Sequence, residues 1–157
     1  VYAKLYDIEA IALRYFNVFG PNQRFDAYGN VIPIFVFKML GGEPITIFGD
    51  GEQTRDFISV VDVVQANIKA SETKCLSGAF NIASGTRITI NDLVARLSEL
   101  VPGHHKVSYG PERPGDVRDS LADIAAARDA FGFEPSVTMA DGLTDYVRWA
   151  MDEANRV

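Results

Sequence analysis

The stretch over residues 49–58 constrains the fold of this chain most, because a glycine-rich turn there leads directly into an apolar run. Glycines flank Asp50, and an Asp-Gly pair predicts a turn because glycine adopts positive φ at little steric cost. Arg55 follows among apolar residues, where an unpaired charge would be costly. Its partner is either a carboxylate, such as the adjacent Asp56, or an anionic ligand, since a guanidinium fork suits phosphate. The residues alone leave both interpretations open.

A second turn, over residues 112–119, contains two arginines and three carboxylates. Ion pairing among these charges is one interpretation of the segment. The alternative is that the Pro-Gly turn directs Arg113 inward, with Asp116 orienting it or accepting a ligand hydroxyl. Two guanidinium groups on separate turns would then neutralise one diphosphate at close range.

Composition limits the classes of protein to which the chain belongs. Its 157 residues, 47% hydrophobic and 23% charged, suffice for one domain with a real core. A formal charge of −6 argues against a nucleic-acid or anionic-membrane surface, so any phosphate needs a local site. No apolar run approaches the ~20 residues of a membrane helix, and no signal peptide is visible. One cysteine permits no internal disulfide, which is typical of a cytoplasmic protein.

The adjacent residues His104 and His105 invite a metal interpretation. Neighbouring side chains do not face the same way on a helix or strand, and no further Cys or His completes a ligand set. We therefore expect no metal site.

Hydrophobic periodicity and capping residues predict an α/β chain in which short strands alternate with helices. The strands are expected at residues 11–16, 45–48 and 79–83, with a loop starting at Asn17. The first helix is expected to end near residue 9, and others to span residues 33–40 and 124–131. The expected N-caps are Ser59, Thr89, Asp123 and Thr138. The helix after Ser59 is expected to bury one stripe, made of Val60, Val63, Val64 and Ile68.

Five motifs in order resemble the nucleotide-sugar epimerase and dehydratase branch of the extended short-chain dehydrogenase/reductases. Residues 13–21 (LRYFNVFGP) are similar to the loop after the sixth strand of that family, and residues 48–64 (FGDGEQTRDFISVVDVV) to its signature. Residues 80–85 (FNIASG), 113–116 (RPGD) and Gly142-Leu143 with Trp149 complete the set. Residues 31–33 (VIP) and RPGD resemble the UDP-glucose and UDP-N-acetylglucosamine 4-epimerases in particular.

The resemblance implies a role for each matching residue in holding a UDP-sugar. Asn17 would hydrogen-bond the diphosphate, and Arg55 and Arg113 would grip it. Asp116 would contact the ribose or steady Arg113. The uracil would lie between two walls, one made of Val31, Ile32 and Phe35 and the other of the strand that runs from Thr46 to Phe48. Phe16 would lie against the nicotinamide of NAD, the cofactor of the family.

The chain departs from the family pattern at the residues that the chemistry needs. It contains neither a G-x-G-x-x-G nor a G-x-x-G-x-x-G motif to seat the NAD pyrophosphate. No Tyr-x-x-x-Lys pair is present either, because Tyr2 is followed four residues later by Tyr6. By family spacing, the chain starts just after the catalytic lysine would have passed.

The resemblance and this departure together imply that residues 1–157 are one C-terminal substrate-binding domain with an incomplete sheet and without the NAD-binding half. We expect the chain to hold no catalytic residue, to bind NAD weakly or not at all, and to be inactive in isolation. The parent enzyme would be a UDP-sugar 4-epimerase, with a 4,6-dehydratase or a decarboxylase as alternatives. A further alternative is a non-catalytic fragment that forms a homo-oligomer through the exposed edge of strand 11–16.

Overall fold

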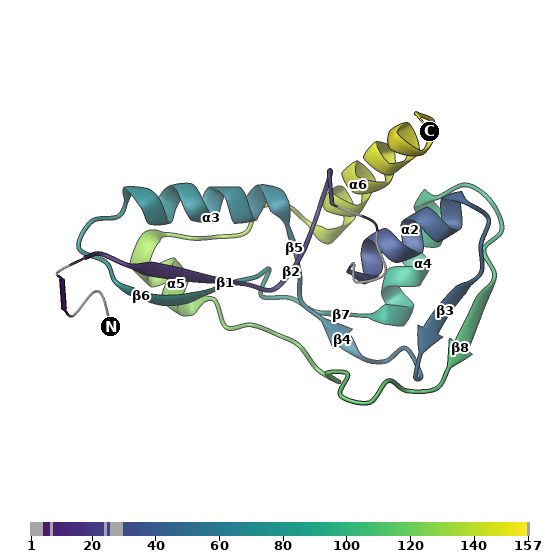
Figure 1. Ribbon diagram of the computed structural model, residues 1–157, viewed down its shortest axis with the longest axis horizontal. Helices are drawn as coiled ribbons and strands as arrows, with labels where there is room; N and C mark the ends of the chain where they lie inside the picture. Colours follow the sequence, from purple (N-terminus) through teal and green to yellow (C-terminus); the bar gives the residue numbers. More distant parts are fainter. Residues whose placement is uncertain (1–4, 7, 24, 26–29, 157) are drawn as a thin grey trace.

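The computed structural model describes residues 5–6, 8–23, 25 and 30–156, and the fold class is α/β, as predicted. Figure 1 shows an elongated molecule in which the elements gather into two lobes joined near its middle. Each lobe has its own hydrophobic cluster, and the two clusters share no residue. We call one the pocket lobe, which includes residues 31–48, 90–110 and 139–154, and the other the edge lobe, which includes residues 11–15, 60–82 and 125–131.

The pocket lobe consists of helices α2 (Val31–Leu40), α4 (Ile90–Leu100) and α6 (Met139–Ala154) with strands β3 (Ile45–Phe48) and β8 (Val107–Gly110). The two strands are parallel, and Ile45 pairs with Val107. Helix α2 contacts both α4 and α6. The core between these elements is closed, because Ile32, Leu93 and Leu143 are each 0% exposed. This lobe therefore buries its apolar faces within itself.

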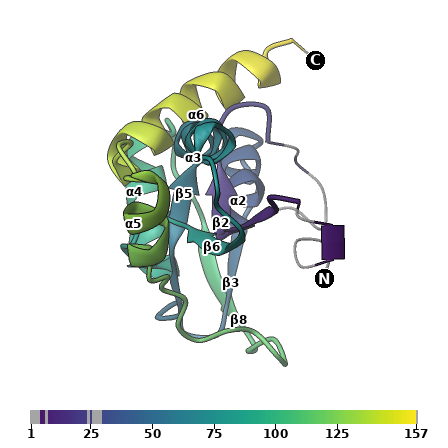
Figure 2. The same cartoon turned by 90° about the vertical axis from the view of Figure 1, so that its left-hand side faces the viewer.

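The edge lobe consists of strands β1 (Ile11–Tyr15) and β6 (Gly78–Ile82) with helices α3 (Val60–Glu72) and α5 (Ala125–Phe131). Strand β1 is parallel to β6, and among the described strands β6 is its only neighbour. Helix α3 packs on β1 and α5 on β6. Figure 2 shows α3 nearly end-on above these strands, with α6 crossing the top of the molecule. One edge of β1 is left unpaired by the described residues, so this lobe holds an open sheet edge.

Two short strand pairs and two buried carboxylates join the lobes. Strand β2 (Asn17–Phe19) is parallel to β5 (Phe57–Ser59), and β4 (Thr54–Arg55) is antiparallel to β7 (Ile88–Thr89). Asp56, 0% exposed, accepts hydrogen bonds from the backbone of Ser84, Gly85 and Ala122 and from the Ser84 hydroxyl. Asp62 similarly accepts bonds from Ser136 and Val137. These bonds satisfy both buried carboxylates, as burial requires.

Local signals in the sequence located most of the elements correctly. The Ser59, Thr89 and Thr138 side chains each accept a hydrogen bond from the backbone at the start of their helices. The prediction of Asp123 as an N-cap is wrong, because the N-cap of α5 is Ile124, although the Asp123 carboxylate accepts a bond from the Ala125 N–H. Gly132 ends α5 with φ at 66°, the left-handed C-cap that glycine adopts at little cost.

Three boundaries differ from the prediction. Helix α2 begins at Val31, two residues before Pro33, because the first turn of a helix accommodates proline. Asn17 lies in strand β2 instead of a loop, since the chain leaves β6 and pairs with β5. The predicted first helix falls largely on residues outside the described set, and residues 8–10 are not helical.

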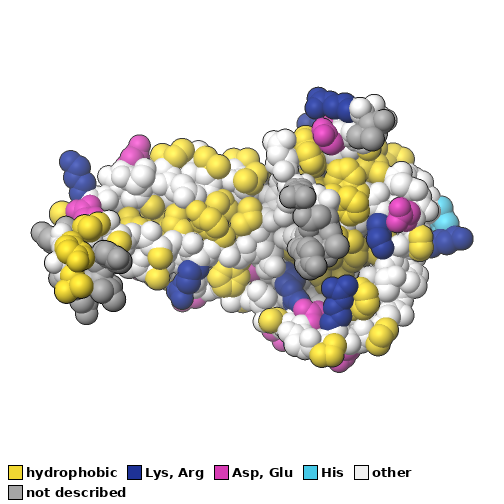
Figure 3. Space-filling model, in the orientation of Figure 1, with side chains coloured by type: hydrophobic (Ala, Val, Ile, Leu, Met, Phe, Trp, Pro, Cys, Tyr) yellow, Lys and Arg dark blue, Asp and Glu magenta, His cyan; other side chains and the backbone are white. Residues whose placement is uncertain are grey.

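The predicted apolar stripe of α3 is wrong for two of its four residues. Val64 is 49% exposed and Ile68 is 42% exposed, whereas Val63, Ala66 and Ala70 are buried. Val61 is also exposed, so a second apolar stripe lies on the outer face of this helix. Figure 3 shows hydrophobic side chains spread over the α3 and β1 region of the edge lobe. Among the described helices, none is long and apolar enough to cross a membrane.

Candidate functional site

A pocket of about 380 Å³ opens in the pocket lobe between α2, β3 and the turn that ends at Asp116. Figure 3 shows dark-blue Lys and Arg side chains gathering on this face, below α2. The lining residues are Asn17, Asn30, Val31, Ile34, Phe35, Lys38, Thr46, Ile47, Phe48, Gln53, Arg55, Ile90, Arg113 and Asp116. The volume suits one mononucleotide-sized ligand.

One face of α2 forms the first wall of the pocket. Val31, Ile34, Phe35 and Lys38 are spaced three or four residues apart, so they project from the same side of the helix. The next face holds Ile32 and Val36, which are 0% exposed and fix the helix against the core. The wall is therefore aliphatic and aromatic along most of its length and cationic at the C-terminal end of the helix.

Strand β3 forms the second wall, and Arg113 covers its end. The Arg113 guanidinium carbon lies 3.8 Å from the centroid of the Phe48 ring. Such a cation–π contact orients the guanidinium without occupying its N–H groups. Among the described residues, no carboxylate lies within ion-pair distance of Arg113. Its hydrogen-bond donors are thus available to a ligand in the pocket.

Arg55 lines the pocket and has three protein partners. Its Nη1 donates to the carbonyl oxygens of Thr54 at 2.7 Å and Val117 at 2.5 Å, and its Nη2 donates to Asp116 Oδ1 at 2.5 Å. Its side chain is 16% exposed. The carboxylate partner that the sequence left open is therefore Asp116 and not the adjacent Asp56, which faces the Ser84-Gly85 loop.

Two amide side chains fix the backbone around the pocket. Asn17 Nδ2 donates to the Asp56 carbonyl oxygen at 2.9 Å, and Gln53 Nε2 donates to the Phe48 carbonyl oxygen at 2.8 Å. Gln53 is 8% exposed, and its Oε1 has no hydrogen-bond partner among the described residues. These bonds join the start of β2 and the end of β3 to residues 53–56, the segment that carries Arg55.

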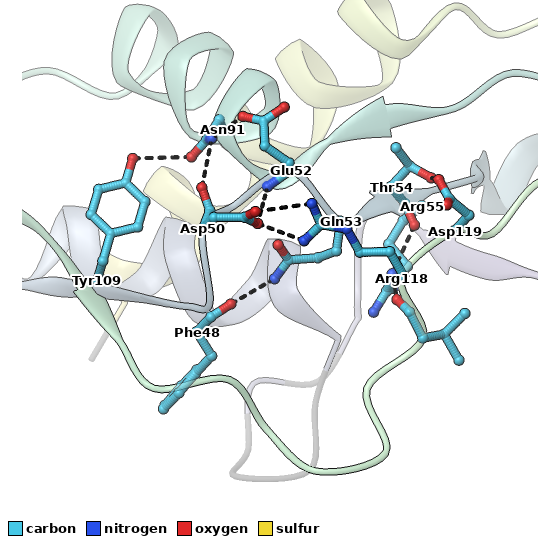
Figure 4. A network of polar contacts seen from close by, with 11 residues as sticks. Phe48, Asp50, Glu52, Gln53, Thr54, Arg55, Asn91, Tyr109, Arg118 and Asp119 are labelled. Carbon is cyan, nitrogen blue, oxygen red and sulfur yellow. Dashed lines mark hydrogen bonds and ion pairs between the residues drawn. The ribbon is translucent and has the colours of Figure 1, made fainter.

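The turn at residues 49–51 is bound to the loop over residues 112–119 through Asp50 and Arg118, as Figure 4 shows. Arg118 donates to both oxygens of Asp50, at 2.6 and 2.9 Å. This bidentate pair lowers the pKa of Asp50 from 3.8 to about 2 and raises that of Arg118. Gly51 has φ at 77°, and a Cβ there would lie 2.0 Å from the Asn91 side-chain oxygen. Only glycine fits this position, which confirms the predicted turn.

The charges around the pocket differ from those of the whole chain. Three cationic side chains (Lys38, Arg55 and Arg113) line the pocket with one carboxylate, Asp116. The complete sequence has a formal net charge of −6. A local cationic site in an acidic protein is the arrangement expected for an anionic ligand, since a general positive field is absent.

Most of the residues that the resemblance singled out meet in this pocket. Eight of them line it: Asn17, Val31, Phe35, Thr46, Phe48, Arg55, Arg113 and Asp116. Ile32 does not, because its side chain is 0% exposed in the core, contrary to the expectation that it walls a base. Phe16 lies outside the pocket and packs against the cluster of the edge lobe. The Asp116 carboxylate contacts the Arg55 guanidinium and not that of Arg113.

Several lining residues were not predicted from the sequence, and Lys38, Ile34 and Gln53 are the most informative of them. Ile34 and Lys38 continue the helical spacing of Val31 and Phe35, so a helix start at Val31 predicts them. Gln53 lies within the glycine-rich segment but carries no charge to distinguish it. A buried amide of this kind is recognised only from its position in the fold.

The described residues give no sign of a metal centre or of an NAD site. No group of three or more His, Cys, Asp or Glu among them could hold a metal ion. The sequence lacks the glycine-rich motif that seats the NAD pyrophosphate, and Phe16 is half-buried in packing contacts. The residues present do not fit NAD by themselves.

The sequence model of the NAD dependent epimerase/dehydratase family matches residues 1–83. The chain belongs to this family. It is 32% identical over 149 residues to a UDP-glucose 4-epimerase of Mycolicibacterium smegmatis, covering 95% of this chain and 48% of the relative. It is also 32% identical over 137 residues to a UDP-glucuronic acid decarboxylase of Arabidopsis thaliana, covering 87% of this chain and 30% of that enzyme.

The fold agrees with solved members of the same family. The crystal structure of a UDP-glucose 4-epimerase from Thermotoga maritima with UDP-glucose superposes with a TM-score of 0.93 at 38% identity. The match covers 98% of this chain and 49% of that structure. The chain therefore spans about half the length of this structure and of the epimerase relative, and its fold is that of part of a Rossmann-like short-chain dehydrogenase/reductase.

Proposed function

We propose that this chain is the nucleotide-sugar-binding portion of an NAD-dependent UDP-sugar 4-epimerase. Residues 1–157 form one substrate-binding domain, and the NAD-binding half of the enzyme is not among them. The observation that carries the proposal is the pocket, in which three cations surround an aliphatic and aromatic slot in a chain of net charge −6. The nearby relatives and structures named for UDP-sugar epimerases support the same ligand class.

Each wall of the pocket has a role in this proposal. Arg55 and Arg113 bind the diphosphate, because guanidinium groups bind phosphate oxygens through paired N–H donors. Asn17, the first residue of β2, adds a hydrogen bond to the diphosphate. The uracil lies between the α2 wall, at Val31 and Phe35, and the β3 wall, from Thr46 to Phe48. Asp116 accepts a hydrogen bond from the ribose.

The isolated chain is proposed to bind without catalysing. Its sequence has neither the Tyr-x-x-x-Lys pair nor the glycine motif, and Phe16 lacks the rest of a nicotinamide site. A 4,6-dehydratase or a decarboxylase parent is the alternative, which the similarity to a UDP-glucuronic acid decarboxylase supports. Interconversion of UDP-sugars by the chain with added NAD would contradict the proposed inactivity.

Calorimetric titration of UDP into the chain tests the proposal directly. Arg55→Ala and Arg113→Ala should each weaken binding by about 1.5–3 kcal/mol, the usual contribution of a hydrogen bond to a charged group. Arg148→Ala is the matched control, since Arg148 is an exposed arginine on α6 outside the pocket. Equal losses in all three variants, or no binding by the intact chain, would contradict the proposal.

The open edge of β1 supports a second candidate, a non-catalytic homo-oligomer. Strand β1 pairs with β6 alone among the described strands, and Val61, Val64 and Ile68 expose apolar surface beside it. Unpaired edges and apolar patches recruit partners. This association is compatible with UDP binding, because the pocket lies in the other lobe.

A further inference from the structure

The Lys38 ammonium lines the pocket without a partner in the protein. Its side chain is half-buried on α2, and none of the described residues forms a hydrogen bond or an ion pair with it. A partly buried ammonium has lost some of its water, and an acceptor on a ligand would replace part of that solvation. Lys38 is therefore a candidate for direct contact with a ligand.

Lys38 lies at one end of the pocket. Figure 1 shows that the chain reverses direction between α2 and β3, so the last turn of the helix lies next to the start of the strand. Lys38 belongs to that last turn, and Thr46 is near the start of β3. From Val31 to Lys38 the helix rises by about 10 Å. We call the part of the pocket at Lys38 and Thr46 the far end.

The two arginines lie at the opposite end of the pocket. The Arg113 guanidinium covers the ring of Phe48, the last residue of β3. Arg55 is bound to Asp116, on the turn that carries Arg113. The cations of the pocket are thus divided into a pair of guanidinium groups at one end and a single ammonium at the far end.

Thr46, the other polar residue at the far end, has its hydroxyl engaged by the protein. Its Oγ1 lies 3.3 Å from Ser108 Oγ, which donates to the Ile45 carbonyl oxygen at 3.2 Å. Because a serine hydroxyl has one proton, Thr46 is the donor in the first of these bonds. Among the described side chains that line the far end, the donors left for a ligand are therefore those of Lys38.

This arrangement determines which edge of a bound pyrimidine meets Lys38. In the proposed function the diphosphate lies at Arg55 and Arg113, and the ribose joins it to N1 of the base. C4 is the ring atom opposite N1, so it points away from the diphosphate and toward the far end. The substituent at C4 is a carbonyl acceptor in uracil and an amino donor in cytosine. An ammonium donates and cannot accept, so it bonds only the carbonyl.

From this geometry we infer that Lys38 is a specificity-determining residue, which selects bases with a carbonyl group at C4 by donating a hydrogen bond to that oxygen. The inference rests on the proposed function, because it assigns the base selectivity of the same pocket to a residue outside the family motifs. Arg55 and Arg113 bind the diphosphate of any nucleotide. Lys38 distinguishes a uridine nucleotide from a cytidine nucleotide.

Calorimetric titration of UDP, CDP and sodium pyrophosphate into the wild-type and Lys38→Met chains tests the inference. Methionine keeps an unbranched apolar side chain but has no N–H donor. The variant should bind UDP about tenfold more weakly, the low end of the range for a hydrogen bond to a charged group. Its affinities for CDP and pyrophosphate should stay within about twofold of the wild-type values, because neither ligand has a C4 carbonyl group.

The wild-type chain gives a second test, which does not depend on how a variant folds. It should bind UDP about tenfold more tightly than CDP, and 4-thio-UDP with intermediate affinity, since sulfur is a weak acceptor. In Lys38→Met the difference between UDP and CDP should shrink to within about threefold. Equal wild-type affinities for UDP and CDP would overturn the inference.

Lys106→Met is the matched control, because Lys106 is an exposed lysine of the pocket lobe that does not line the pocket. It removes the same charge and should leave all three affinities within about twofold. The inference is overturned if Lys38→Met leaves UDP binding unchanged, or if it weakens UDP, CDP and pyrophosphate equally. In both cases, UDP binding by the wild type would leave the proposed function standing. Absence of that binding would overturn the proposed function together with the inference.

Discussion

The two lobes of the chain differ in how completely they bury their own apolar surface. In the pocket lobe, α2, α4 and α6 close over β3 and β8, and the pocket between α2 and β3 is lined by three cations. In the edge lobe, α3 exposes Val61, Val64 and Ile68, and one edge of β1 pairs with no other described strand. Both lobes have the same alternating strands and helices. The two lobes differ in how much of the apolar surface of these elements the rest of the lobe covers.

This difference suggests a separate location for each of the two proposed activities, ligand binding and self-association. The pocket lobe contains both walls of the proposed ligand site, α2 and β3. The edge lobe presents an apolar helix face and a strand edge, which are features of an interface. Substitutions in the pocket lobe should therefore change the affinity for a ligand, and substitutions in the edge lobe should change the affinity of self-association.

Truncation of one aliphatic side chain in each lobe should give the largest contrast. Leu93→Ala removes a side chain that is 0% exposed in the pocket lobe, and it should destabilise the chain by about 2–5 kcal/mol. Ile68→Ala removes a similar side chain that is 42% exposed, and it should cost less than about 1 kcal/mol. Urea denaturation measures both. Equal losses would show that the outer face of α3 is covered in solution.

The junction between the lobes should be sensitive to the charge of Asp56. Asp56→Asn keeps the shape of the side chain but turns an acceptor toward the backbone N–H groups of Gly85 and Ala122 into a donor. The free energy of unfolding should fall by about 2–3 kcal/mol. Asp145→Asn, at a 63% exposed aspartate on α6, is the control and should change stability by less than about 0.5 kcal/mol. An Asp56→Asn variant with unchanged stability would show that the hydrogen bonds of Asp56 contribute little to the free energy of unfolding.

The open edge should make association depend on concentration. Light scattering of the wild-type chain should show a mass that rises with concentration, because apolar surface on α3 is buried on contact. Ile68→Glu should weaken this association about tenfold, since a carboxylate replaces apolar surface at the contact. Ala95→Glu, at an exposed position of α4 in the pocket lobe, changes the net charge by the same amount and is the control. A monomer at every concentration would contradict the proposed oligomer.

The smallest effect should come from the exposed pair that anchors the loop of the pocket lobe. The pKa of Asp50 is lowered to about 2, so the pair stabilises the fold above pH ~4 and loses this contribution as the pH falls through about 2. The urea midpoint of the wild type should exceed that of Asp50→Asn above pH ~4. Below pH ~4 the difference between the two urea midpoints should shrink. A difference that stays constant down to pH 2 would show that the ionised pair is not its cause.

Local chemistry in the sequence predicted the elements and much of the site. Hydroxyl side chains at Ser59, Thr89 and Thr138 mark helix starts because they accept bonds from the first free backbone N–H groups. Glycine at position 51 marks a turn because no side chain fits there. Residue types also predicted that Arg55 needs an anionic partner. Each of these signals acts over a few residues, so the sequence is sufficient to specify it.

Only the tertiary structure decided which distant groups meet. Arg55 pairs with Asp116, which lies 61 residues away, although Asp56 is its neighbour in the sequence. Periodicity placed Val64 and Ile68 on one side of a helix, but it does not tell which side the other elements cover. Lys38 belongs to the pocket because α2 packs with that face toward β3. Such contacts depend on how the elements pack together, which no short stretch of sequence specifies.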